Sequence, residues 1–485
     1  DRSRGLGDVY KRQVPFDKIK TGDYVPAIRE GIRRQNAEIE AIIRNPEVPT
    51  FANTVLAYEK SGEMLHRVST VFGNLLSAET DDDLQELAKE IMPMMSEHEN
   101  NISLNEELFA RIKAVYEQQD KETLSPEQHK LLEDIYNGFV RNGANLLGED
   151  KEKYRALCKE LSLLTLQFSE NNLKETNDYK LVITDKSQLA GLPESAVEAA
   201  AETAGEKGVE GWVFTLQAPS YGPFLTYADS RDLRRELYMA YNTKCTHDNA
   251  SNNLEIVKKL ANVRMEIAQL LGYDNFAEYN LQERMAQNSE SVYKLLDQLL
   301  EAYTPTAKQE YAEVQALARQ AEGEDFVLMP WDWAYYSHKL KDRKFNIDDE
   351  LLRPYFELNN VKQGVFGLAT RLYGITFKKN PDIPVYHKDV DAYEVFDKDG
   401  KFLAVFYTDF HPRAGKRSGA WMTSYKEQWI DEKTGENSRP HISIVMNFTK
   451  PTQDKPALLT FGEVETFLHE FGHSLHGMFA NTTYG

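Results

Sequence analysis

Thr460–Phe479 have the sequence TFGEVETFLHEFGHSLHGMF, a pattern that predicts one amphipathic helix. Thr460 and Glu463 fit a capping box, in which each side chain bonds a backbone N–H that the first turn leaves open. Apolar residues then recur at spacings that place them along one helical face: Val464, Phe467, Leu468, Phe471, Leu475 and Met478. His469, His473 and His476 are expected on the other side, so the helix should pack by one face and present histidines on the other.

His469 and His473 are the candidate metal ligands of this helix. Four residues advance an α-helix by about 6 Å and turn it about 40° past a full circle, so the two imidazoles project side by side. Two such imidazoles can hold one Zn²⁺ at about 2.0–2.1 Å each. Glu470 is expected on the flank of the same face, where its carboxylate can act on a water molecule without binding the ion. The arrangement is the H-E-x-x-H motif of a zinc peptidase.

The composition restricts the classes of partner. The sequence has 57 basic and 77 acidic residues, so its net charge is −20. This charge argues against nucleic acid or an anionic membrane surface as partner. Cys158 and Cys245 are too few for a disulfide framework or a cysteine zinc site, which fits a reducing compartment. No apolar run approaches the length of a membrane span. We therefore expect the cytoplasm, with the periplasm as the alternative because the native N-terminus is missing from the sequence.

Both ends of the sequence look unlike native termini. Residues 1–13, DRSRGLGDVYKRQ, show no periodicity and resemble a translated adapter scar, so we leave them out of the fold prediction. The last residues, NTTYG, carry no capping or tail signal. We expect a fragment truncated at both ends, with an N-terminal helical region over 14–225 and a catalytic region over 226–485 that is truncated at its C-terminus.

Helical periodicity dominates the rest of the chain, which predicts a mainly α fold. Predicted helices cover 24–44, 54–76, 82–102, 104–118, 125–143, 151–174, 253–271, 291–321 and 361–373. A hairpin of strands over 392–396 and 402–407 is predicted around the turn KDGK, and a third strand over 442–448. The segment PSYGP at 219–223 is expected to be a turn.

Four histidines outside the predicted zinc helix are not expected to bind metal. His66, His98 and His129 each occur singly within predicted helices, so we expect surface or packing roles for them. His338 lies in MPWDWAYYSHKLK, 329–341, and is not expected to bind metal. The aromatic residues around it are either a packed core or the wall of a cleft, since aromatic rings with polar tips serve both purposes.

His411–Met422, HPRAGKRSGAWM, is a candidate substrate-binding loop. Gly415, Gly419 and Ala420 are small enough for a peptide backbone to approach closely. An edge strand beside the histidine helix could accept an extended peptide through main-chain hydrogen bonds. The alternative is an ordinary basic loop with glycine turns. His476 is too far along the helix to share an ion with His469, and we keep it as a packing or substrate-binding candidate.

Several segments together resemble the thimet oligopeptidase and neurolysin family of zinc metallopeptidases, over nearly all of 14–485. They are LSPEQHKLLED, RRELYMAY, MPWDWAYYSHKLK, DFHPRAGKRSGAWM, NFTKPTQDKPALLTF and HEFGHSLHGMF. The last two are most similar to the dipeptidyl carboxypeptidases of that family. The resemblance implies an elongated helical body of the neurolysin type, split by a deep channel, with a small β-sheet beside the HExxH helix. Such a channel admits short unstructured peptides, and a monomer is expected.

The resemblance also assigns roles to residues. His469 and His473 become ligands of one Zn²⁺, Glu470 the catalytic carboxylate, and the third ligand a Glu beyond Gly485, so the chain as written is expected to be inactive. The expected function is release of C-terminal dipeptides from short peptides. An endo-acting oligopeptidase of the same family is the first alternative, and a non-catalytic helical peptide-binding protein is the second.

Overall fold

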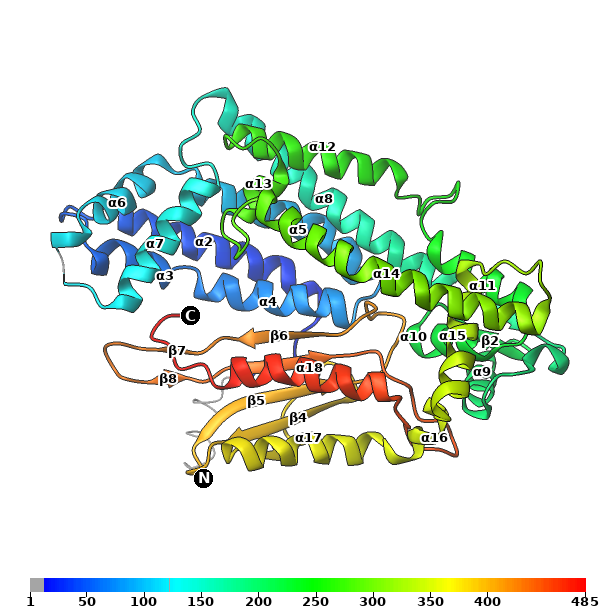
Figure 1. Ribbon diagram of the computed structural model, residues 1–485. Coiled ribbons are helices and arrows are strands. Elements are labelled where there is room, and N and C mark those ends of the chain that lie inside the picture. The colour runs from blue at the N-terminus through cyan, green and yellow to red at the C-terminus, as the bar shows by residue number, and fades with distance from the viewer. Residues whose placement is uncertain (1–12, 122) are drawn as a thin grey trace.

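The N-terminal part of the computed structural model, which describes residues 13–121 and 123–485, is a set of packed helices (Figure 1). The prediction that 1–13 is a scar lies outside the described residues, apart from Gln13. The helices are α2 Tyr24–Ile43, α3 Leu56–Glu59, α4 Glu63–Ala78, α5 Asp82–Ser103, α6 Glu106–Glu117, α7 Pro126–Arg141 and α8 Glu149–Asp178.

The single helix predicted over 54–76 is wrong. A π-helical turn at Phe51–Val55 leads into α3, and α4 starts only after Gly62. Gly62 has a φ of +74°, and a Cβ there would lie 2.3 Å from the side-chain amide of Gln35. The chain therefore turns at a left-handed glycine, a conformation that other residues rarely adopt.

The middle of the chain is also mostly helical. Its helices are α9 Glu194–Glu206, α10 Ala218–Tyr227, α11 Arg231–Asn242, α12 Leu254–Leu270, α13 Phe276–Leu281, α14 Ser289–Glu322, α15 Trp333–Phe345 and α16 Asp349–Leu352. Strands β1 Leu181–Ile183 and β2 Trp212–Phe214 pair antiparallel. The turn predicted at PSYGP is wrong, because these residues lie within α10. Pro219 occupies its first turn, where no N–H is needed, and Phe224 and Leu225 are buried.

One five-stranded sheet lies in the C-terminal part of the chain. Its order is β3-β4-β5-β9-β6, and every pair is antiparallel except β5 with β9. The strands are β3 Thr376–Lys379, β4 Val390–Phe396, β5 Phe402–Asp409, β6 Trp421–Lys426 and β9 His441–Val445. The predicted hairpin is confirmed as β4 and β5, and the predicted third strand is the shorter β9. β3, β6 and the small hairpin of β7 Trp429–Ile430 with β8 Asn437–Ser438 were not predicted.

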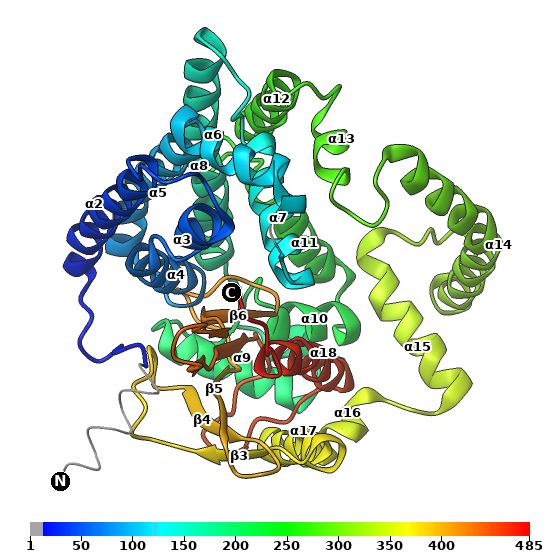
Figure 2. The ribbon, with the colours of Figure 1, turned by 90° about the vertical axis from the view of Figure 1, so that its left-hand side faces the viewer.

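The two faces of this sheet pack against different helices. Ala404 and Phe406 of β5 pack with α17 Leu358–Tyr373 and α18 Phe461–Met478. Their neighbours Val405 and Tyr407 point the other way, into a core shared with α2, α4 and α5. This is the period-two alternation of a strand that is buried on both faces. α4 also lies along β6 at the edge of the sheet (Figure 2).

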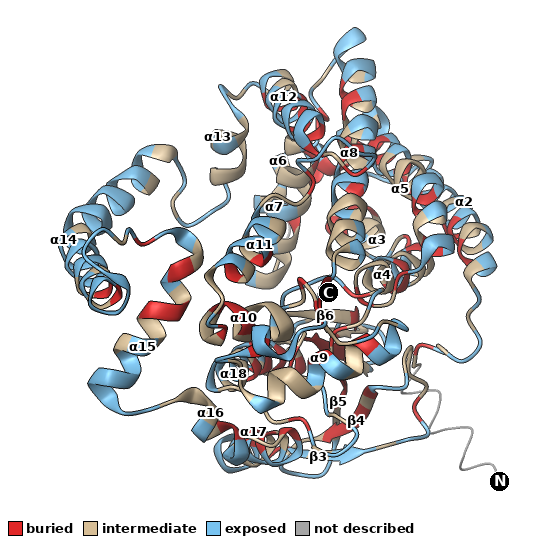
Figure 3. Cartoon of the chain, turned by 90° about the vertical axis from the view of Figure 1, so that its right-hand side faces the viewer, coloured by how far each residue is buried: buried red, intermediate tan, exposed pale blue. Residues whose placement is uncertain are grey.

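The aromatic segment 329–341 mostly packs inward. Tyr335 and Tyr336 of α15 form a small core with the C-terminal half of α14, while Trp333 stays 41% exposed. Asp332 is fully buried and accepts hydrogen bonds from Arg231 and Arg234. These contacts favour the packed-core interpretation of the segment. The N-terminal half of α14 is largely exposed (Figure 3).

No helix among the described residues is long and apolar enough to cross a membrane.

Candidate metal centre and peptide-binding strand

The start of α18 is fixed by Thr460, the residue before the helix, and by the segment that follows β9. Thr460 Oγ1 accepts a hydrogen bond from the Glu463 N–H at 3.2 Å, and Glu463 Oε2 accepts one from the Thr460 N–H at 2.9 Å. The predicted capping box is therefore confirmed. Glu463 also accepts a hydrogen bond from the Thr449 N–H at 2.7 Å. Burial raises the pKa of Glu463 despite these hydrogen bonds. The helix is thus anchored to the segment that follows β9.

His469 and His473 lie side by side, as their spacing predicts. Their Nε2 atoms are 3.2 Å apart, and their ring centroids are 4.9 Å apart with the planes at 77°. Two nitrogen ligands at 2.0–2.1 Å from a tetrahedral zinc ion lie about 3.3 Å from each other. Both imidazoles are exposed at the surface. The two nitrogens therefore fit a shared zinc ion.

Glu470 lies on the buried side of α18. It is 8% exposed and belongs to the stripe that packs on the sheet together with Phe467, Phe471 and Ser474. Leu468, which the periodicity placed in that stripe, is 42% exposed, so its predicted burial is wrong. Glu470 is therefore on the side of the helix that is buried, and Leu468 is on the side that is exposed.

The described part of the chain brings no third ligand side chain to His469 and His473. Within 13–121 and 123–485, no group of three or more His, Cys, Asp or Glu side chains could hold a metal ion. His476 is exposed near the end of α18 and joins no such group.

The remaining histidines make contacts elsewhere. His66 bonds Glu427 at 3.1 Å, and His98 bonds Gln35 at 2.7 Å. The ring of His338 packs edge-on against Tyr227. His129 lies 3.3 Å from Gln119. The contacts of His66, His98 and His129 agree with the packing and surface roles predicted for these three residues.

The glycines of the candidate loop have different surroundings. Gly415 O accepts a hydrogen bond from the Thr80 N–H at 2.8 Å, and a Cβ on Gly415 would lie 2.2 Å from Thr80 O. The close approach predicted for Gly415 is therefore to the end of α4, not to a peptide. Gly419 has a φ of +99° and open space beside it. Its carbonyl accepts a hydrogen bond from Asn447 Nδ2 at 2.7 Å.

Gly419 and Ala420 border a cavity of about 560 Å³. Thr460, directly before α18, and Thr466 of α18 line it together with residues of α10. His469 and Glu470 do not line this cavity. The structure thus brings the two small residues to the N-terminal end of the histidine helix, with space for a bound chain.

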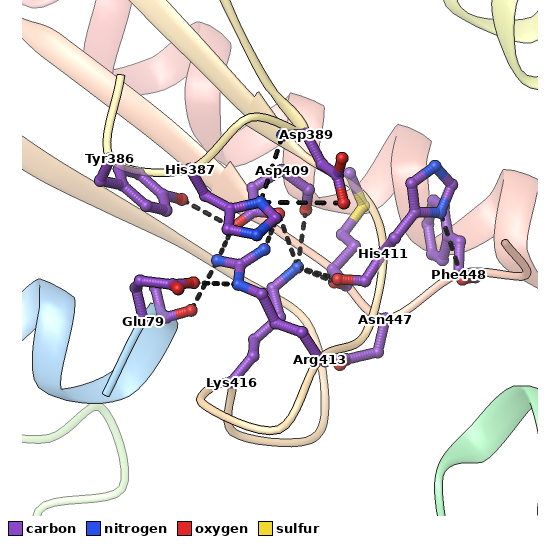
Figure 4. Close-up of polar contacts among 12 residues, drawn as sticks. Glu79, Tyr386, His387, Asp389, Asp409, His411, Arg413, Lys416, Asn447 and Phe448 are labelled. Atoms are coloured by element: carbon purple, nitrogen blue, oxygen red, sulfur yellow. Dashed lines mark hydrogen bonds and ion pairs between the residues drawn. The ribbon is translucent and has the colours of Figure 1, made fainter. Parts of the chain in front are cut away.

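A buried ionic cluster beneath the loop was not predicted (Figure 4). Asp409, at the end of β5, is fully buried and accepts hydrogen bonds from Arg413, Lys416 and Tyr386. Burial alone raises the pKa of Asp409, but Arg413 and Lys416 outweigh it and hold the pKa below its ordinary range. The sequence signal was an aspartate directly before a basic loop, and such a pattern also occurs at solvated surfaces.

Comparison with known proteins identifies the family. A model described as Peptidase family M3 matches residues 224–485, which is more than half of the chain. The chain belongs to peptidase family M3. Members of this family are zinc peptidases. The conclusion agrees with the family resemblance found in the sequence.

Curated relatives of this M3 chain align along nearly its whole length. The dipeptidyl carboxypeptidase of Escherichia coli is 40% identical over 97% of the chain and 68% of its own length. Oligopeptidase A of Escherichia coli is 34% identical over 96% of the chain and 68% of its own length. The chain thus spans about two thirds of these relatives.

The solved structure of PZ peptidase A with inhibitor 2 is also similar to this chain. It is 16% identical, covers 94% of this chain and 64% of its own, and has a TM-score of 0.44.

Proposed function

We propose that the full-length protein is a zinc-dependent peptidase that releases dipeptides from the carboxyl ends of short peptides. The observation that supports this most is the pair of Nε2 atoms of His469 and His473, 3.2 Å apart on one helix, with the buried Glu470 beside them. Within family M3, the dipeptidyl carboxypeptidases of Escherichia coli and Salmonella typhimurium are 40% and 38% identical to the chain.

The roles of the three residues follow from their chemistry. His469 and His473 would hold the zinc ion, with a third ligand, a Glu, contributed by residues beyond Gly485. Bound zinc lowers the pKa of a water molecule to about 7 and polarises a carbonyl group. Glu470 accepts the proton of the attacking water and passes it to the leaving amine. With two ligands only, the chain as given would bind zinc weakly.

The edge strand β6 is the proposed binding surface for the substrate. Its partner in the sheet is β9 on one side only. On the other side, the Asn74 side chain of α4 bonds the carbonyl of Ser424 and the hydroxyl of Thr423. The strand begins directly after Gly419 and Ala420, which border the cavity. An extended peptide could add there through main-chain hydrogen bonds.

Short unstructured peptides are the proposed partners, because only an extended backbone can add to a strand in this way. A channel that excludes folded proteins and a monomeric state remain part of the proposal. Cys158 and Cys245 are unpaired, which supports the cytoplasm as the proposed compartment.

Replacing Glu470 by Gln tests the mechanism. In the full-length protein this change removes the general base and keeps the shape of the side chain, so hydrolysis should fall at least about a thousandfold while zinc content stays the same. Glu465→Gln is the matched control, since Glu465 is an exposed glutamate of the same helix. A Glu470→Gln variant that hydrolyses peptides as fast as the unchanged protein would contradict the mechanism.

An endo-acting oligopeptidase is the second candidate, because oligopeptidase A relatives are 34% identical over nearly the same length. C-terminal amidation of a test peptide separates the two functions. A dipeptidyl carboxypeptidase must capture a free carboxylate, so amidation should abolish cleavage. Equal cleavage of free and amidated peptides would favour the oligopeptidase.

A further inference from the structure

The segment from Phe410 to Ala420, here called the β5–β6 loop, sets where the edge strand begins. It leaves the sheet at the end of β5 and returns at Trp421, the first residue of β6. It contains no helix or strand of its own. Its position therefore depends on contacts with other parts of the molecule.

The buried side chain of Lys416 connects this loop to the sheet through hydrogen bonds. Its side chain is fully buried, and Nζ donates hydrogen bonds to Asp409 Oδ1 at 2.7 Å, His411 O at 2.7 Å and Met446 O at 2.6 Å. These acceptors belong to the end of β5, the start of the loop and the residue after β9. Nζ also lies 3.3 Å from Asp409 O, and the three shorter hydrogen bonds match the three N–H groups of an ammonium. Burial lowers the pKa of Lys416 to about 8, against the opposing effect of Asp409.

Arg413 ties the same loop to the N-terminal helices (Figure 4). Its guanidinium contacts both oxygens of Asp409, at 2.8 and 2.7 Å, and donates to Ala78 O at 2.6 Å. It also pairs with Glu79 near the end of α4. The backbone adds two further hydrogen bonds: Arg417 N–H donates to Ser77 O of α4, and the N–H of Thr80, two residues after α4, donates to Gly415 O.

The far end of the loop is held by Asn447, two residues after β9. Asn447 Nδ2 donates to Arg417 O at 3.0 Å and to Gly419 O at 2.7 Å. The chain then enters β6 with the Gly419 φ of +99°. Asp409, Arg413 and Lys416 are thus the charged groups that fix the path between two strands. A buried charge is costly unless it is fully paired, so the loop can hardly move without breaking the cluster.

We propose that Lys416 is a positioning residue that sets the start of edge strand β6 for peptide binding. The proposal rests on the proposed function, because it takes β6 as the strand to which the substrate adds. Lys416 does not touch the substrate. It acts through the backbone of the β5–β6 loop, so its loss should weaken binding of the peptide more than the chemical step.

Replacing Lys416 by Met tests the proposal in the full-length protein. Methionine keeps most of the buried volume but loses the three hydrogen bonds, while Asp409 keeps Arg413 and Tyr386. We expect KM for a short peptide to rise about tenfold, with kcat changed less than about twofold and zinc content unchanged. Hydrogen exchange of residues 410–422 without substrate should become at least about tenfold faster.

Lys151→Met is the matched control. Lys151 is also largely buried and joins α8 to the start of α6 through Leu104 O and Glu106, away from β6. It should lower stability but leave KM and the exchange of 410–422 unchanged. If Lys416→Met and Lys151→Met change KM and this exchange equally, the positioning role is overturned.

Glu79→Gln provides a milder second variant in case Lys416→Met does not fold. It weakens the pairing of Arg413 with α4 and leaves the cluster around Asp409 in place. We expect KM and the exchange of 410–422 to change in the same direction, by about threefold. No change in either would overturn the proposal. Faster exchange in the variants, together with full activity of Glu470→Gln, would refute the proposed function and leave the role of Lys416 in placing the loop intact.

Discussion

The helix α18 and the β5–β6 loop build the two parts of the candidate site in opposite ways. In α18, the contacts that matter join residues three or four apart: Thr460 with Glu463, and His469 with His473. In the loop, Arg413 contacts Glu79, which is 334 residues away in the sequence. The proposed chemistry therefore rests on local geometry, and the proposed substrate surface on tertiary contacts.

Burial differs between the two parts as well. The imidazoles of His469 and His473 are exposed, whereas Asp409 and the side chain of Lys416 are fully buried. Exposed ligands can be changed at little cost to folding. Buried charges cannot, because each one depends on its partner. Variants in α18 should thus alter function first, and variants beneath the loop should alter stability first.

The largest effect is expected for His473→Ala, which removes one of the two proposed zinc ligands. Zinc content should fall at least about a hundredfold and hydrolysis at least about a thousandfold in the full-length protein, with little change in the melting temperature of the metal-free form. Metal analysis and a peptide assay measure both. His129→Asn, a histidine outside the site, should retain its zinc. A large loss of stability in metal-free His473→Ala would contradict the expectation that changes in α18 affect function before stability.

The next effect is expected for Asp409→Asn, which leaves Arg413 and Lys416 without their shared buried carboxylate. The free energy of unfolding should fall by about 3 kcal/mol, measured by urea denaturation. Asp399→Asn, in the exposed turn between β4 and β5, should change it by less than about 0.5 kcal/mol. Equal effects of the two changes would show that the buried cluster does not stabilise the loop.

Because the pKa of Asp409 is lowered in the folded state, its contribution to the free energy of unfolding should depend on pH. A carboxyl whose pKa is lowered in the folded state binds fewer protons there than in the unfolded chain. Its stabilising contribution is therefore complete above its ordinary pKa of about 3.9 and is lost as the pH falls through the lower folded pKa. The difference in stability between the unchanged protein and Asp409→Asn should shrink in that acidic range.

The smallest effect is expected for the pair of His66 and Glu427, which joins α4 to the end of β6 across 361 residues. Its hydrogen bond to Glu427 raises the pKa of His66, so the folded state favours the protonated imidazole. The resulting stabilisation is present below pH ~6.5 and is lost as the pH rises through the raised pKa. Because both side chains are more than half exposed, it should amount to only about 0.3 kcal/mol.

Thermal unfolding of the unchanged protein and of His66→Gln at pH 5.5 and pH 8.5 measures this contribution. The two proteins should differ slightly at the lower pH and coincide at the higher one. A difference as large as that of Asp409→Asn would mean that sequence separation, and not burial, sets the energy of these contacts.

Much of the fold could be predicted because its signals are local. The capping box of α18, the spacing of His469 and His473, and the hairpin around KDGK each depend on residues a few positions apart. The long helices α2, α5 and α14 were found for the same reason, since apolar periodicity reports a buried face.

The errors occurred where packing overrides local signals. Prolines and a glycine predicted a turn at PSYGP, but burial of Phe224 and Leu225 stabilises α10 there. Leu468 is exposed and Glu470 buried, because the sheet beneath sets the rotation of α18. Apolar periodicity does not show how a helix is rotated about its axis, so it could not show that Glu470 is buried and Leu468 exposed.

The sequence by itself determined the helix that carries the histidines and the kind of chemistry they can perform, because an α-helix fixes the distance between side chains four residues apart. Only the tertiary structure decided which side chains face the sheet, where β6 begins and why Lys416 is buried. Those features depend on α4, β5 and β9 meeting in space, and residues far apart in a chain are brought together by packing alone.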